Sequence, residues 1–113
     1  EFYRQLQEEI QDDRIILIHD SAEFIQKHLN DAGFIHADYV ISSLPLTNFP
    51  NKLKETILQA AHHCLVNDGK YIQFAYSLIS KKILQTQFDE TNISFTPLNF
   101  PPAFIYTCSK TKN

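Results

Sequence analysis

The stretch ADYVISSLPL, residues 37–46, decides the fold of this chain. Its apolar centre, residues 39–41, is typical of a buried strand, and two serines and a rigid Leu-Pro turn follow directly. In open α/β sheets, ligands bind in the crevice beyond the carboxyl ends of the strands. We therefore expect the hydroxyls and the backbone after this strand to face a binding site.

Helical and strand-like patterns alternate on both sides of this stretch. The expected helices lie at residues 1–10, 22–30, 47–66 (counting its cap) and 78–88, and the expected strands at residues 14–18, 38–44, 70–76, 92–96 and 103–108. The last two strands are too close in sequence for a helical crossover, so we expect an antiparallel hairpin. The pattern predicts an α/β fold with a parallel sheet, helices on both faces and this terminal hairpin.

Capping and turn-forming residues set the expected ends of these elements. Asp20 or Ser21 is expected to cap the second helix and Gly33 to end it. Thr47 or Asn48 is expected to cap the third helix, with Pro50 in its first turn. Residues 67–69, Asn-Asp-Gly, are expected to form the turn before the third strand.

The composition fits one small globular domain. The 113 residues are 43% apolar and carry a net charge of −3, which argues against non-specific binding of nucleic acid. No apolar run approaches the roughly 18 residues of a membrane span. The cysteines, Cys64 and Cys108, and the histidines show no metal-ligand spacing, so we expect buried thiols in a reducing cytoplasm and no metal.

Three short motifs carry a resemblance to a known family. Residues 41–46, ISSLPL, resemble the Val-Ser-Gly-Leu-Pro-Leu stretch of the bacterial phospholipid N-methyltransferases. Residues 73–76, QFAY, resemble their Gln-Phe-Thr-Tyr, and residues 98–103, LNFPPA, resemble their Asn-Leu-Pro-Pro-Ala. The motifs stand in the family's order, and with the flanking elements the match covers nearly the whole chain. The chain thus resembles the second half of a class I methyltransferase, a Rossmann-like fold that uses S-adenosyl-L-methionine.

The sequence also departs from this family. Ser43 stands where the family usually has Gly, and residues 19–22, HDSA, stand where it has Gly-Asp-Ala. The family's first strand, its glycine-rich loop and its second strand would all precede residue 1. We therefore expect residues 1–109 to be the C-terminal portion of a single methyltransferase domain, and residues 110–113 to be a polar tail.

The resemblance implies a cofactor site at the ends of two strands. Asp20, Ser21 and Ser42 would contact S-adenosyl-L-methionine, and Asp20 would accept a hydrogen bond from the adenine amino group. A helix N-cap is the alternative role for Asp20, and one residue can fill both roles.

The resemblance also implies a methyl-acceptor edge. Its catalytic residues would be Ser42, Ser43, Leu44, Pro45 and Tyr76. A main-chain carbonyl and a hydroxyl at a rigid turn can orient an amine, so catalysis would be largely positioning. Substrate would be bound by Leu46, Phe74, Asn99, Phe100 and Pro101. The alternatives are an ordinary strand-to-helix turn for the serines, half-buried packing for Tyr76, and a stiff turn with an aromatic plug at residues 99–102.

The function implied is methyl transfer to the amine of phosphatidylethanolamine or a similar phospholipid, at the cytoplasmic membrane surface of a bacterium. An RNA adenine methyltransferase is the first alternative, but Leu46 stands where stacking on a base would favour an aromatic side chain. A catalytically incomplete fragment that only binds or self-associates is the second. Residues 78–88, with Lys81 and Lys82, offer either a contact with a bilayer surface or a helix packed on the sheet.

The family's sheet order makes one further expectation. That order is 3-2-1-4-5-7-6, in which residues 14–18 form the far edge strand and two absent strands separate them from residues 39–41. An open strand edge is an association hazard. We therefore expect residues 14–18 to move beside residues 39–41, or the open edge to pair with another copy.

Overall fold

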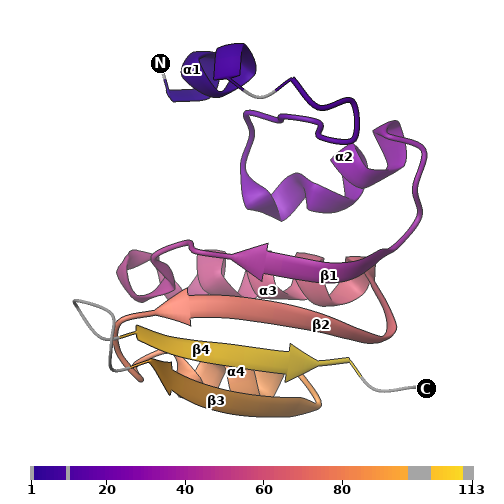
Figure 1. Cartoon of the computed structure of the whole chain (residues 1–113). Helices are drawn as coiled ribbons and strands as arrows, with labels where there is room; N and C mark the ends of the chain where they lie inside the picture. Colours follow the sequence, from indigo (N-terminus) through magenta and orange to yellow (C-terminus); the bar gives the residue numbers. More distant parts are fainter. Residues whose placement is uncertain (1, 10, 97–102, 111–113) are drawn as a thin grey trace.

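A computed structural model describes residues 2–9, 11–96 and 103–110 of the chain (Figure 1). The helices are α1 (Phe2–Glu9), α2 (Ile25–Asp31), α3 (Asn51–Cys64) and α4 (Lys81–Gln87), with short 3₁₀ turns η1 (Ala22–Phe24) and η2 (Leu46–Asn48). The strands are β1 (Ala37–Ser42), β2 (Leu65–Ala75), β3 (Glu90–Thr96) and β4 (Ala103–Ser109).

The four strands form one mixed sheet in the order β1-β2-β4-β3. β1 runs parallel to β2, while β4 runs antiparallel to both β2 and β3. This order is the 4-5-7-6 part of the expected sheet, and the expected antiparallel hairpin is confirmed. The parallel pair β1 and β2 matters for function because both strands end at the same edge of the sheet.

The core lies between one face of the sheet and the helices α3 and α4. Tyr71 of β2 and Tyr106 of β4 point into it, where they meet Leu58 of α3 and Leu84 of α4. The two cysteines, expected as buried thiols, are buried and free. Leu84 of α4 is one of these core residues. Of the two roles expected for residues 78–88, α4 therefore has that of a helix packed on the sheet.

The opposite face of the sheet is exposed within the described residues. Tyr39 and Ile41 of β1 are 65% and 67% exposed, and Phe74 of β2 is 42% exposed. Figure 1 shows α3 and α4 behind the same face of the sheet. The fold class is confirmed, but helices on both faces are not found in this part of the chain. The chain makes one parallel crossover, β1–α3–β2, and the fixed hand of such a crossover places α3 on one face only.

The expected strand at residues 14–18 is wrong. These residues form no strand and do not lie beside β1. Ile15, Ile16 and Ile18 remain 46–60% exposed, and the segment runs along α2, where Ile16 and Ile18 line a shallow pocket with Leu29. An apolar run becomes a strand only where a neighbouring strand takes up its backbone hydrogen bonds. Pairing of the open β1 edge with another copy stays a prediction.

Most element ends follow the expected residues, with two shifts. Gly33 ends α2 as predicted, at φ +93°, and the amides of Gly33 and Phe34 bond to carbonyls near the end of the helix in a Schellman arrangement. α3 begins at Asn51 with Pro50 at the N-cap position, so the expected Thr47 or Asn48 cap is wrong. The expected turn at residues 67–69 is a bulge inside β2, where Asp68 takes φ +67°.

Candidate functional site

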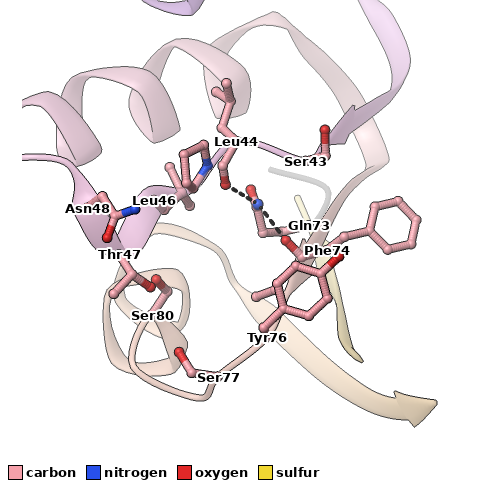
Figure 2. Close-up of a pocket in the computed structure, with 12 residues that line it drawn as sticks. Ser43, Leu44, Leu46, Thr47, Asn48, Gln73, Phe74, Tyr76, Ser77 and Ser80 are labelled. Atoms are coloured by element: carbon pink, nitrogen blue, oxygen red, sulfur yellow. Dashed lines mark hydrogen bonds between the residues drawn. The ribbon is translucent and has the colours of Figure 1, made fainter. Parts of the chain in front are cut away.

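A pocket lies where β1 and β2 end side by side. Ser42, the last residue of β1, is in register with Gln73 of β2. Beyond this pair the chain opens a pocket of about 250 Å³, which Figure 2 shows in close-up. Its lining residues are Ser43, Leu44, Pro45, Leu46, Thr47, Asn48, Gln73, Phe74, Ala75, Tyr76, Ser77 and Ser80. The expected binding crevice at this edge is therefore present.

The turn after β1 closes through its own hydrogen bonds. The Oγ of Ser42 accepts the N–H of Leu44 at 3.2 Å, and the carbonyl oxygen of Leu44 accepts the N–H of Leu46 at 2.8 Å. Pro45, the residue between them, takes φ −78° and ψ 70°. This is an inverse γ-turn, so Ser43, Leu44 and Pro45 are held in one conformation at the pocket wall.

A second donor reaches the same Leu44 carbonyl. Nε2 of Gln73 donates to it at 2.9 Å (Figure 2). A carbonyl oxygen has two lone pairs, and here both are used. The expectation that a main-chain carbonyl of this turn takes a substrate proton therefore does not fit Leu44. Ser43, which is exposed, offers its hydroxyl as another acceptor in this turn.

Gln73 is the residue at this pocket that the sequence analysis missed. It is only 1% exposed, and its Nε2 also donates to the carbonyl oxygen of Phe74 at 3.0 Å. Its Oε1 accepts the hydroxyl of Tyr71. The alternation of side chains along the strand could have indicated it. Tyr71, Gln73 and Ala75 share the inner face, and a buried glutamine there needs hydrogen-bond partners.

The hydroxyl of Tyr71 is held in its protonated form. Burial raises the pKa of Tyr71 to about 12, while a hydrogen bond with the Ser42 side chain acts in the opposite direction. At neutral pH the phenol is therefore a reliable donor to Gln73. Ser42, Tyr71 and Gln73 together form a buried polar group between the two strand ends.

The structure brings six of the predicted site residues around this pocket. They are Ser43, Leu44, Pro45, Leu46, Phe74 and Tyr76. Tyr76 is exposed, and its ring stands at the pocket in Figure 2. Phe74 contributes backbone only, because its ring lies on the open face of the sheet and points away from the pocket. Leu46 is 3% exposed and packs into the core.

Two of the three predicted cofactor residues, Asp20 and Ser21, lie directly before η1, and the third, Ser42, ends β1. One Asp20 oxygen accepts the N–H of Ser21 at 2.8 Å, and the other lies 2.7 Å from Nε2 of His28. The hydrogen bond from His28, and then that from Ser21, lowers the pKa of Asp20, so its carboxylate is ionised at neutral pH. Neither Asp20 nor Ser21 makes a side-chain cap to the helix that follows.

A second, mostly apolar pocket of about 300 Å³ lies between the acceptor turn and the start of η1. Ala22 and Ile25, just after Asp20, form one wall. The end of β1 forms another, and this pocket shares Ser43 and Leu44 with the first one. Ser42 lines this second pocket rather than the first. Of the predicted cofactor residues, only Ser42 lines a pocket, while Asp20 and Ser21 precede the pocket-lining Ala22 in sequence.

The remaining predicted site residues, Asn99, Phe100 and Pro101, lie outside the described residues. Among the residues that are described, no group of three or more His, Cys, Asp or Glu side chains could hold a metal ion. No helix in that part of the chain is long and apolar enough to cross a bilayer.

The chain is similar to known methyltransferases in sequence and in fold. No protein-family model matches the chain. Over 85 residues the chain is 31% identical to an ornithine lipid N-methyltransferase from Singulisphaera acidiphila, a match covering 74% of this chain and 44% of that protein. A solved structure from Clostridium thermocellum, described as an rRNA methylase, aligns at a TM-score of 0.60 and 16% identity, covering 97% of this chain and 65% of the other.

These matches define the fold and the extent of the likeness. The chain spans less than half the length of the relative that it matches in sequence. The structural alignment covers 97% of this chain. The chain therefore has the Rossmann-like α/β fold of the methyltransferases that use S-adenosyl-L-methionine.

Proposed function

We propose that the chain provides the methyl-acceptor side of an S-adenosyl-L-methionine-dependent N-methyltransferase that acts on the amine of phosphatidylethanolamine or a similar phospholipid. The observation that carries the proposal is the pocket at the ends of β1 and β2. The exposed side chains of Ser43 and Tyr76 line it, and a second pocket on the same turn is lined by Ala22, two residues after Asp20. The sequence relative, an ornithine lipid N-methyltransferase, supports an amine on a lipid as the acceptor.

The second pocket fits the adenosine part of the cofactor. Its walls from Ala22, Ile25 and Val40 offer apolar surface for a flat ring. The ionised carboxylate of Asp20, beside this pocket in sequence, can accept a hydrogen bond from an amino group. S-adenosyl-L-methionine supplies a methyl group on a positively charged sulfur, so the protein needs no nucleophile of its own.

The first pocket would orient the acceptor amine. A neutral amine attacks the methyl carbon, so that the N–C bond forms as the S–C bond breaks, and the ammonium product then loses a proton to water. The hydroxyl oxygens of Ser43 and Tyr76 can each accept an N–H and so direct the nitrogen lone pair. Holding the two reactants in line can supply most of the rate acceleration in such a reaction.

The surface beside the pocket fits a lipid acceptor. Leu78 and Ile79 are exposed, and the pocket-lining Ser77 and Ser80 stand on either side of them. The exposed Lys81 and Lys82 follow at the start of α4. Apolar side chains next to lysines favour contact with the surface of an anionic membrane. We propose that this segment makes a peripheral membrane contact at the cytoplasmic face.

The burial of Leu46 argues against a nucleobase as the acceptor. Enzymes that act on a base stack it between aromatic or apolar side chains. The position after Leu-Pro is a leucine packed into the core, and the net charge of −3 gives no attraction for an RNA backbone. An RNA adenine methyltransferase is therefore the weaker candidate.

The proposal is tested by a transfer assay on the natural protein expressed in full. S-adenosyl-L-methionine with a labelled methyl group is offered with vesicles of phosphatidylethanolamine, vesicles of phosphatidylcholine, or an unstructured adenine-rich RNA. We expect label only in the phosphatidylethanolamine vesicles, because the choline nitrogen has no free lone pair. Label in the RNA, or in none of the three, would contradict the proposal. If none of the three substrates is labelled and the protein sediments as a dimer, the results would favour a protein that only binds or self-associates.

A further inference from the structure

A buried amide ties together the two strand ends that form the acceptor pocket. Nε2 of Gln73 donates to the carbonyl oxygens of Leu44, in the turn after β1, and Phe74, at the end of β2. Figure 2 shows both bonds beside the pocket. The hydroxyl of Tyr71 donates to Oε1, so the amide is fixed from both ends. We call this arrangement of Gln73, the Tyr71 hydroxyl and the two carbonyl oxygens the Gln73 clamp.

The Gln73 clamp fixes a turn whose other closing bonds are internal. The N–H of Leu44 bonds to Ser42, and the N–H of Leu46 bonds to Leu44, so both bonds shape the turn without fastening it to β2. The bond from Gln73 to Leu44 crosses between the two strand ends, at 2.9 Å. Because Gln73 is 1% exposed, water cannot easily replace the bond. The clamp therefore sets where the turn stands relative to the end of β2.

Ser43 and Tyr76, the two hydroxyl-bearing residues that we expect to meet the amine, flank the residues of the Gln73 clamp in sequence. Ser43 immediately precedes Leu44, and Tyr76 follows Phe74 by two residues. Movement of Leu44 relative to Phe74 would change the separation of these hydroxyls. A displacement of about 1 Å in a positioned reactant can cost about a hundred-fold in rate.

We infer that Gln73 is a positioning residue for the methyl transfer, and that it acts by holding the Leu44 carbonyl so that Ser43 and Tyr76 present their hydroxyls to one amine. The inference rests on the proposed function and adds to it a residue that touches neither substrate nor cofactor. It also assigns the Leu44 carbonyl to the scaffold, so that Ser43 and Tyr76 are the proposed acceptors of hydrogen bonds from the amine.

Two substitutions at the same position test the inference. Gln73→Met keeps the length and loses both donors, whereas Gln73→Glu keeps the shape and regains one donor when its carboxyl group is protonated. We expect Gln73→Met to lower kcat on phosphatidylethanolamine by about ten- to a hundred-fold, with KM for S-adenosyl-L-methionine little changed. The ratio of Gln73→Glu to wild-type kcat should rise as the pH falls, whereas the ratio for Gln73→Met should stay flat. Each ratio is taken at one pH, so ionisation of the amine substrate cancels.

A matched control separates positioning from loss of stability. Cys64→Ala also alters a fully buried side chain, in α3 and outside both pockets, and should leave kcat within about two-fold at temperatures where it stays folded. A kcat for Gln73→Met within two-fold of wild type would overturn the inference. So would equal and flat pH ratios for the Met and Glu variants.

A structural readout distinguishes this failure from failure of the proposed function. In the natural protein, the carbonyl carbon resonance of Leu44 should shift in Gln73→Met and not in Cys64→Ala. If wild type transfers methyl groups and the Leu44 resonance does not respond, the inference fails and the function stands. If wild type transfers none, the function and the positioning role both fail, whatever the resonance does.

Discussion

At the scale of single residues, the buried polar group between β1 and β2 stands out. Tyr71 and Gln73 occupy inner positions of an otherwise apolar strand, and each is 1% exposed. A buried polar group without a partner would cost about 1–3 kcal/mol, so both side chains must be satisfied. Among the described residues, no buried side-chain nitrogen or oxygen lacks a partner. The hydrogen bonds of Tyr71 and Gln73 that shape the pocket are therefore also needed for the stability of the fold.

The raised pKa of Tyr71 predicts a loss of stability in alkali. The unfolded tyrosine ionises near the ordinary tyrosine pKa of 10.0, whereas the folded one keeps its proton up to a pKa of about 12. Between these values the folded state binds more protons, so its stability falls as the pH rises. Relative to Tyr71→Phe, the wild-type free energy of unfolding should fall by about 2–3 kcal/mol from pH 9 to pH 12.

Urea unfolding of the two proteins across this range measures the difference. The buried groups Cys64, Cys108 and Tyr106 also have raised pKa values, but both proteins contain them and their contributions cancel. A difference between wild type and Tyr71→Phe that stays constant from pH 9 to pH 12 would contradict the burial of the phenol. The lost hydrogen bond to Gln73 adds only a constant offset.

At the scale of elements, the sequence predicted correctly those features that depend on residues close together in the chain. The helix end at Gly33 and the antiparallel pairing of β3 with β4 agree with the sequence, because glycine conformation decides the first and a short connection decides the second. The sheet order β1-β2-β4-β3 was expected only from the family resemblance. The prediction of a strand at residues 14–18 was wrong because an apolar run does not show whether a neighbouring strand is present to pair with it. Gln73 was missed because only the pairing of β2 with its neighbours shows that the glutamine points inward.

Gly33 offers a test of one such local force. Its φ is +93°, and a Cβ added there would meet nothing within 4 Å. Gly33→Ala should therefore lower the free energy of unfolding by about 1 kcal/mol from backbone strain alone. Gly33→Asn should lose less, because asparagine tolerates the left-handed region better. Thermal unfolding of both variants measures the effect, and equal losses would show that something other than backbone conformation is responsible.

At the scale of the whole molecule, the described residues form one four-stranded sheet with helices packed on one of its faces. α3 and α4 cover one face of the sheet, while Tyr39, Ile41 and Phe74 leave apolar surface on the other. The sequence match covers 44% of the relative. The pockets nevertheless lie within the described residues, at the edge where β1 and β2 end. Binding of the cofactor product is therefore the property that connects this chain to the proposed activity.

The most direct measurement is a calorimetric titration of the natural protein, expressed in full, with S-adenosyl-L-homocysteine. We predict binding in the micromolar range, about ten-fold weaker in Asp20→Asn, because an amide presents one oxygen where the carboxylate presents two and carries no charge. Glu55→Gln, on the exposed part of α3 and outside both pockets, should bind as wild type does. An absence of heat with wild-type protein at millimolar ligand would contradict the assignment of a methyltransferase site to these strand ends.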